Sequence, residues 1–307
     1  MLKNQKFGVE VEMTGITRER AAQIVAEVLG TTPSGPDGTV YHTRTIADQA
    51  ARKWKVMRDS SITPVRNDGG SESMDQYRVE FVTPPLNYED IELLQKIIRK
   101  LKENGAKSHS SCGIHIHVDG ANHNPKSLRR LVNFMTSRQN LIYEALEIRH
   151  REGDWCRKLN IALLDEMKKD KDLTRESAER IWYSRANDGY YGGIDHSHYN
   201  STRYHGVNLH SYFSKGTVEF RLFNSTLHAG KIKAYIQFCL AVSAWSITSQ
   251  EKVVFRSMEG YTAEQKVTIM RNILTNRLGL YGDEFKTCRL HLMTPLKKSA
   301  GMTCRVA

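Results

Sequence analysis

The feature that most constrains this chain is the segment CGIHIHVDG at residues 112–120, in which apolar and polar side chains alternate. Successive side chains on a β-strand point to opposite faces of the sheet. A strand here would direct Ile114, Ile116 and Val118 into a core and place His115 and His117 together on the other face. Taken alone, such a motif is more often a half-buried strand whose polar face meets water than a ligand site.

Two further segments have the same alternation. FGVEVEM at residues 7–13 places Glu10 and Glu12 on one strand face, and TVEFRLF at residues 217–223 does the same for Glu219 and Arg221. If the three polar faces belong to one sheet, carboxylates, imidazoles and a guanidinium converge on one surface. That combination is typical of a site for divalent metal ions and phosphate groups.

The remaining pattern interleaves strands with amphipathic helices, and a turn at 214–216 predicts an antiparallel hairpin. We therefore predict an α+β fold in which helices cover the apolar face of one sheet. The expected strands are 6–13, 40–46, 53–57, 77–82, 112–120 and a hairpin of 203–213 with 217–223. The expected helices are 18–29, 90–103, 124–149, 231–249 and 262–278.

Length and composition describe a soluble globular protein. The 307 residues suffice for a large core, and no apolar run is long enough for a membrane span. The N-terminus lacks an apolar signal region, and the five cysteines form no CxxC pair, so we expect a cytoplasmic protein with free thiols. We expect one catalytic domain over 1–282, followed by a basic, irregular and mobile tail over 283–307.

The net charge of +11 indicates an anionic partner, either nucleic acid or an anionic substrate such as ATP. The basic residues are spread along the chain, and we find neither an aromatic platform nor a nucleic-acid-binding motif. A nucleic-acid partner is therefore not our first expectation.

Six short blocks occur in a fixed order between about residues 6 and 230: FGVEVE, WKVMRDSSI, VEFVTPP, CGIHIHVD, YHGVNL and TVEFRLFNSTL. In this order they resemble the putative amidoligase family, a branch of the carboxylate–amine ligase superfamily that includes glutamine synthetase and glutamate–cysteine ligase. The resemblance implies a glutamine-synthetase-like catalytic domain, with a largely antiparallel twisted sheet and helices packed on one face. It also implies ATP-dependent formation of an amide or peptide-like bond through an acyl phosphate.

The resemblance, together with the residue chemistry, implies a role for each candidate. Carboxylates suit Mg²⁺, and an imidazole ligand would also allow Mn²⁺. Arg221 would stabilise the transferring phosphoryl group, and Asp59 would position or deprotonate the amine. The predicted metal ligands are Glu10, Glu12, Glu80, His115 and Glu219, and the predicted nucleotide or substrate contacts are His117, Arg203 and Asn208. The expected partners are ATP, a carboxylate donor and an amine acceptor, with no membrane.

Each candidate also has a structural interpretation. Glu10 and Glu12 could be an exposed strand face, and Asp59 could belong to a turn with Ser60 and Ser61. Glu80 could pair with Arg78, and Glu219 could pair with Arg221. Three histidines, His196, His198 and His205, lie in or just after the polar loop 186–202. They could form a zinc site, or the loop could be a substrate lid.

Two other functions use the same features. The acids and histidines could activate a metal-bound water in a hydrolase or nuclease. The net charge could instead serve a basic nucleic-acid-binding protein.

Overall fold

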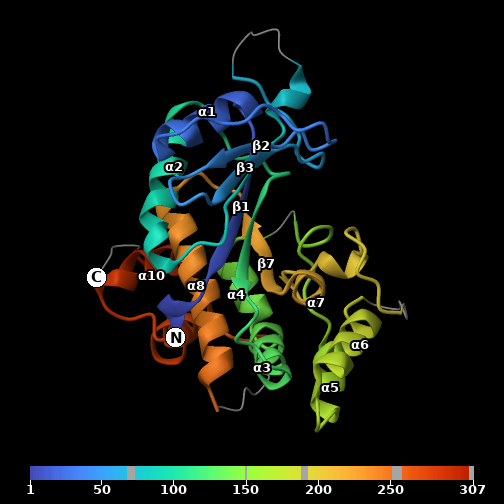
Figure 1. Cartoon of the computed structure of the whole chain (residues 1–307). Coiled ribbons are helices and arrows are strands. Elements are labelled where there is room, and N and C mark those ends of the chain that lie inside the picture. Colours follow the sequence, from blue (N-terminus) through green and yellow to red (C-terminus); the bar gives the residue numbers. More distant parts are fainter. Residues whose placement is uncertain (68–72, 149–150, 188–192, 251–257, 304–307) are drawn as a thin grey trace. The chain divides into compact units, whose positions relative to one another are not determined.

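The computed structural model of the chain describes residues 1–67, 73–148, 151–187, 193–250 and 258–303 (Figure 1). The strands are β1 Phe7–Met13, β2 Arg44–Ala47, β3 Lys53–Met57, β4 Val79–Val82, β5 Gly113–Asp119, β6 Val207–Asn208 and β7 Thr217–Asn224. The α-helices are α1 Arg18–Leu29, α2 Ile91–Glu103, α3 Pro125–Thr136, α4 Gln139–Ala145, α5 Ile161–Lys169, α6 Arg175–Arg185, α7 His210–Lys215, α8 Ala229–Thr248, α9 Ala263–Asn272 and α10 Lys286–Ser299.

The strands follow the order β2-β3-β4-β1-β5-β7-β6 in one sheet. The pairs β1–β4, β2–β3, β3–β4 and β6–β7 are antiparallel. Helices and antiparallel strands therefore share the chain, which confirms the predicted α+β class.

The packing divides the chain into two compact units. Unit 1 comprises Met1–Gln5, His117–Leu222 and Ala234–Ala307, and unit 2 comprises Lys6–Ile116 and Phe223–Lys233. Strands β5 and β7 each contribute residues to both units. The single catalytic domain expected over 1–282 stays a prediction.

In unit 2, helices α1 and α2 pack on each other, and α1 also packs on β2 and β3. Helix α1 begins where the Thr17 side chain accepts a hydrogen bond from the Arg20 amide, and it ends at Gly30 in the left-handed conformation. Both signals were readable from the sequence. The apolar side chains of β1, Val9, Val11 and Met13, are fully buried.

Helix α8, which belongs to unit 1 from Ala234 on, carries mainly apolar side chains, and most of these are buried. Trp245 packs against Phe134 of α3, with ring centroids 5.1 Å apart. The N-terminal segment is attached to α8 because Gln5 donates to the Leu240 carbonyl and accepts from the Ser243 hydroxyl.

Two predicted elements differ from the structure. The expected single helix over 124–149 is two helices, α3 and α4, separated by Ser137 and Arg138. In the expected hairpin, the antiparallel pairing of β6 with β7 is correct, but β6 comprises Val207 and Asn208 alone, and α7 replaces the last four residues of the expected strand and the turn. Leu209, Tyr212 and Phe213 are spaced three and four apart, which is a helical period.

The C-terminal segment is also more regular than expected. Residues 286–299 form helix α10, which packs on α9 and α4. Cys288, Leu292 and Leu296 recur every four residues and are buried. The expectation of an irregular tail is therefore wrong for this stretch, because this apolar stripe was hidden among basic residues.

Candidate functional site

Each of the three alternating strands has at least one buried side chain on its polar face. The exposed fractions are 4% for Glu12, 3% for His115 and 3% for Glu219. A water-facing strand surface is therefore excluded for these residues. Burying an ionised carboxylate is costly unless a cation or several hydrogen bonds compensate it.

In unit 2, Glu12 on β1 lies directly opposite Glu80 on the antiparallel strand β4. Two like charges at such a cross-strand position destabilise a sheet. His115 on β5 completes the group, and one possible ligand atom from each of the three side chains lies within 4.8 Å of the others. The arrangement fits one cation held by two carboxylates and one imidazole, which suits Mg²⁺ or Mn²⁺.

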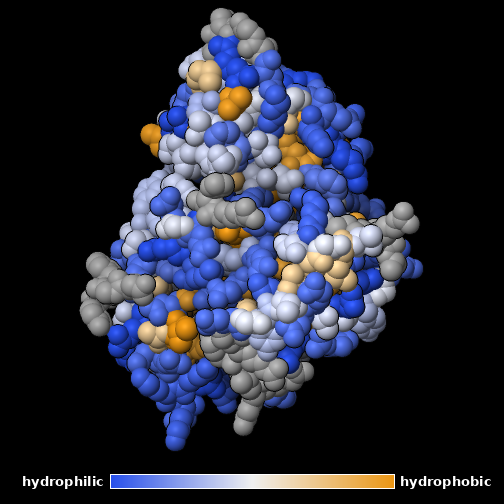
Figure 2. All heavy atoms as spheres, turned by 180° about the vertical axis from the view of Figure 1, so that it is seen from behind, coloured by the Kyte–Doolittle hydropathy of each residue, from blue (hydrophilic) through white to orange (hydrophobic). Residues whose placement is uncertain are grey.

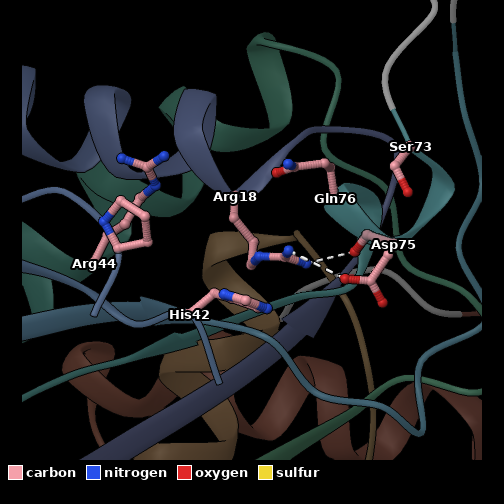
Figure 3. Close-up of a pocket in the computed structure, with 7 residues that line it drawn as sticks. Arg18, His42, Arg44, Ser73, Asp75 and Gln76 are labelled. Atoms are coloured by element: carbon pink, nitrogen blue, oxygen red, sulfur yellow. Dashed lines mark hydrogen bonds and ion pairs between the residues drawn. The ribbon is translucent and has the colours of Figure 1, made fainter. Parts of the chain in front are cut away.

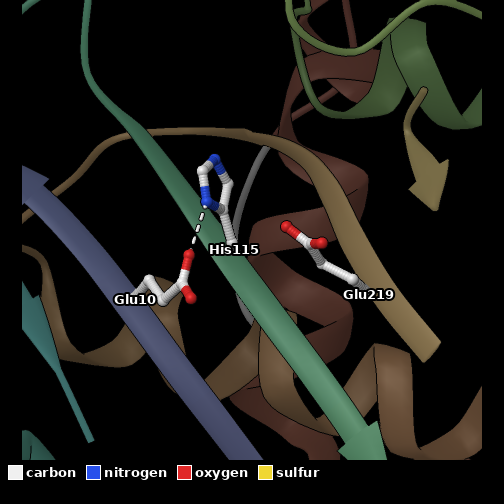
Figure 4. A group of neighbouring side chains, drawn as sticks. All are labelled: Glu10, His115 and Glu219. Atoms are coloured by element: carbon white, nitrogen blue, oxygen red, sulfur yellow. Dashed lines mark hydrogen bonds and ion pairs between the residues drawn. The ribbon is translucent and has the colours of Figure 1, made fainter. Parts of the chain in front are cut away.

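The His115 ring lies between two carboxylates of β1. Its Nδ1 lies 2.9 Å from Oε2 of Glu10, and its Nε2 lies 3.7 Å from Oε1 of Glu12. Figure 4 shows the Glu10–His115 hydrogen bond between β1 and β5. When Nδ1 donates to Glu10, the lone pair on Nε2 is directed to the side where Glu12 lies. A carboxylate that orients a histidine in this way is typical of metal sites.

The second oxygen of Glu12 is also fixed. Its Oε2 accepts a hydrogen bond of 2.6 Å from the Gly113 amide. The Ser225 hydroxyl donates to the Glu12 carbonyl and so helps to hold this part of β1. Glu12 is therefore held as a carboxylate of fixed orientation, as a metal ligand requires.

In unit 1, Glu219 on β7 is engaged by two donors. The Asn208 side-chain amide donates to Oε2 of Glu219, and the Arg221 guanidinium donates to Oε1 of Glu219. Each hydrogen bond is 2.6 Å long. The pairing of Glu219 with Arg221 that the sequence left open is therefore present. His117 lies nearby, with its Nε2 3.8 Å from Oε1 of Glu219 and its Nδ1 2.9 Å from the Thr217 hydroxyl.

Arg221 is 4% exposed and is positioned by more than its ion pair. Its amide donates to the Gly206 carbonyl. Its guanidinium carbon lies 5.8 Å from the centre of the Tyr204 ring, within the range of a cation–π interaction. Such a buried guanidinium of fixed orientation is suited to an anionic oxygen.

Two predicted residues have other surroundings. Asp59 follows β3 and accepts hydrogen bonds from the amide and the hydroxyl of Ser61, as in the turn interpretation. Arg203 lies at the end of the 3₁₀-helix Ser201–Arg203 and donates to the His198 carbonyl. Neither belongs to the ligand groups found among the described residues.

The sequence left open that Glu80 pairs with Arg78. In the structure, Arg78 contacts other residues. The Arg78 guanidinium donates to the carbonyls of Ser60 and Ile62, and it lies 3.5 Å from Asp75. Glu80 instead belongs to the group with Glu12 and His115.

The second histidine cluster has separate partners for two of its members. His196 bonds Glu179, and His205 bonds the Thr202 carbonyl. No group of possible metal ligands within the described ranges includes them. Residues 188–192 of the predicted loop 186–202 lie outside the described residues, so its role as a lid stays a prediction.

Two contributors to these groups were not predicted. The Gly113 amide is a backbone donor, and no side-chain pattern indicates it. Tyr204 is the first residue of the YHGVNL block, but its position at Arg221 depends on the fold.

Four cysteines, 112, 156, 239 and 288, are buried and form no disulfide among the described residues. Burial raises the pKa of the Cys156 thiol to about 11 and raises that of Cys239 well above its usual value. These two thiols are therefore protonated and unsuited to act as nucleophiles.

Within the described ranges, none of the helices combines the length and apolar character needed to cross a membrane.

A family model described as "Putative amidoligase enzyme" matches residues 3–243. The match includes β1 to β7 and therefore every predicted site residue. No curated protein matches the chain.

Proposed function

This chain belongs to the putative amidoligase family, and from that premise we propose that it is an ATP-dependent carboxylate–amine ligase with a glutamine-synthetase-like catalytic fold. The observation that carries the proposal is the buried group of Glu12, Glu80 and His115 in a chain that matches this family over most of its length. Two opposed carboxylates beside an imidazole are stabilised by a divalent cation, and ATP is used by enzymes as a complex with such cations.

In this proposal Glu12, Glu80 and His115 hold Mg²⁺ or Mn²⁺, and Glu10 orients His115. When bound, the ion supplies positive charge to the phosphate oxygens of ATP. Glu219, a buried carboxylate that Asn208 and Arg221 hold in place, is proposed as a further metal ligand.

The first chemical step transfers the γ-phosphoryl group. A carboxylate oxygen of the substrate attacks the γ-phosphorus, the bond from phosphorus to the bridging oxygen breaks, and ADP leaves. Negative charge on the transferred group is stabilised by the Arg221 guanidinium, which its contacts hold in place. The product of the step is an acyl phosphate.

The second step forms the amide bond. The amine nitrogen attacks the acyl carbon, the carbon–oxygen bond to phosphate breaks, and the nitrogen releases one proton. Asp59 is proposed as the base that receives it, which requires that the substrate displace its contact with Ser61. His117, Asn208 and Arg203 are proposed as nucleotide or substrate contacts.

The proposal is tested by substrate-dependent ADP release, measured with a panel of amino acids and peptides in the presence of ATP and Mg²⁺ or Mn²⁺. Glu12→Gln and Arg221→Ala should each lower kcat by at least about a hundredfold. Arg20→Ala is the matched control for Arg221→Ala, because Arg20 is half-exposed and pairs with Glu27 on the surface of α1.

Unchanged turnover in both site variants would refute the assignment. Metal-dependent cleavage of an ester, peptide or nucleic acid without any nucleotide would instead identify a hydrolase.

A further inference from the structure

Unit 2 contains a cavity of about 190 Å³. Its lining includes none of the residues of the acidic group described above. It lies between the start of α1, the segment before β2 and the 3₁₀-helix η2, Met74–Tyr77 (Figure 3). Its lining is mostly polar and basic: Arg18, Pro36, His42, Arg44, Ser73, Asp75 and Gln76.

The cavity has an excess of positive charge. Asp75 is the one carboxylate among the described lining residues, and three guanidiniums approach it: Arg18 at 3.2 Å, Arg58 at 2.8 Å and Arg78 at 3.5 Å. Arg44 adds a further positive charge to the lining, and its contact with Glu19 is long, at 3.7 Å. Within the described lining, two guanidiniums, Arg18 and Arg44, therefore stand against one carboxylate.

Asp75 remains ionised and keeps Arg18 in place. Burial raises the pKa of Asp75, but the hydrogen bonds and charges of Arg58 and Arg18 outweigh it and lower the pKa below its usual value. Arg18 is 5% exposed, and it also donates to the carbonyls of Asp75 and Arg78. Arg18 is thus a fixed structural cation, and the remaining donors of the lining are left for a ligand.

His42 reaches this cavity through an unusual backbone conformation, with φ of 46°. Such a conformation is uncommon for residues other than glycine. The loop around it is held by Asp37, whose Oδ1 accepts hydrogen bonds from the amides of Thr39 and Thr43. In Figure 3 the His42 ring and the Gln76 amide lie on either side of the Arg18 guanidinium.

The size of the cavity limits the ligand. Its volume corresponds to roughly six water molecules at about 30 Å³ each. It is smaller than the pockets of about 300–1,000 Å³ that enclose drug-sized ligands, so the cavity would enclose only a small group. The space does suffice for a carboxylate with a few attached atoms.

We infer that this cavity binds the free carboxylate of an amino acid or of a peptide end, with Arg44, His42 and Gln76 as the ligand's partners. The inference that the bound molecule is a substrate rests on the proposed ligase function. The binding itself does not, because it needs neither ATP nor a metal ion.

The test is ligand-observed NMR with the twenty amino acids and a set of dipeptides, at low ionic strength and without ATP or metal. Calorimetry then measures the Kd of the best binder. Arg44→Gln should weaken that binding by at least about tenfold, because a charged hydrogen bond is lost. Arg20→Gln removes the same charge from the surface of α1 and should change Kd by less than about twofold.

A further arm replaces the ligand's carboxylate by a carboxamide, which should abolish binding. Binding that survives this replacement, or that is equal in Arg44→Gln and the parent protein, would overturn the inference. So would the absence of any amino-acid or peptide binder, or Arg44-dependent binding of inorganic phosphate alone.

Failure of the proposed function gives a different result. If no substrate elicits ADP release while Arg44-dependent carboxylate binding persists, the ligase assignment fails and the carboxylate site stands. Glu12→Gln should bind the carboxylate ligand with unchanged Kd, since Glu12 does not line the cavity.

Discussion

Replacement of Glu80 by Gln tests the metal site through stability, independently of any substrate. Glu80 and Glu12 are directly opposed across β1 and β4, and their ligand atoms lie within 4.8 Å of each other and of His115. At that separation two full charges repel by about 3 kcal/mol at an effective dielectric constant of about 20. The hydrogen bond from the Gly113 amide to Glu12 offsets part of this repulsion.

In the absence of metal, Glu80→Gln should therefore raise the free energy of unfolding by about 1–3 kcal/mol. The glutamine keeps the size and the strand position of the glutamate, so packing changes little. Most substitutions at partly buried positions destabilise. A gain in stability from the loss of one charge is thus a specific sign of like-charge repulsion.

In the presence of metal this difference in stability should narrow or reverse. A ligand at a hundred times its Kd stabilises the native state by about 2.7 kcal/mol. The parent protein should gain this stability from Mg²⁺ or Mn²⁺, whereas Glu80→Gln should gain much less because a ligand is missing. The assay is denaturant unfolding with a chelator and at increasing metal concentrations.

Glu103→Gln is the matched control, since Glu103 is exposed on α2 and pairs with Lys100 on the surface. Its stability should stay within about 0.5 kcal/mol of the parent in both conditions. Our reasoning is refuted if Glu80→Gln destabilises the metal-free protein and metal leaves the parent protein's unfolding unchanged.

Further predictions concern unit 1. Burial lowers the pKa of His123 to about 4, below its usual 6.5, so the stability contributed by its neutral form should be lost as pH falls from 6.5 to 4, by about 3 kcal/mol at most. Denaturation of His123→Asn at several pH values should show a flatter dependence over this window, and an unchanged slope would contradict the assignment. Gly206→Ala should destabilise by about 1–3 kcal/mol, because an added Cβ would overlap the Tyr143 hydroxyl. Chemical denaturation should show partial recovery in the double variant with Tyr143→Phe; purely additive effects would argue against the overlap. Arg221→Lys keeps the charge but loses the planar fork, so kcat for ADP release should fall by at least about tenfold, whereas a fall of less than twofold would show that charge alone suffices.

Local patterns predicted much of the fold. Strand β3 occupies the predicted residues 53–57, and α1 has the predicted cap residues at both ends. These elements are decided by neighbouring residues: alternation defines a strand face, while Thr17 and Gly30 terminate a helix. The failures occur where two periods overlap. A strand was predicted within residues 203–216, but Tyr212 and Phe213 lie in the helix α7.

For the candidate site, the sequence indicated which side chains share a strand face but not how each is used. Glu10 and Glu12 are equivalent in the alternation, yet one bonds the His115 ring and the other bonds the Gly113 amide. That difference arises from the position of β5 beside β1. This position is set by contacts between residues that lie about a hundred positions apart in the sequence.

By itself the sequence determined the polar dyads, the helix ends and the resemblance to a family, because these depend on residues close together in the chain. Only the tertiary structure decided that Glu12, His115, Glu219 and Arg221 are buried, that Glu80 lies opposite Glu12, and that three guanidiniums lie close to Asp75 beside a cavity. The physical reason is that strand register and desolvation are properties of the packed sheet. A carboxylate on a strand becomes a ligand when packing removes its water and places a second carboxylate opposite.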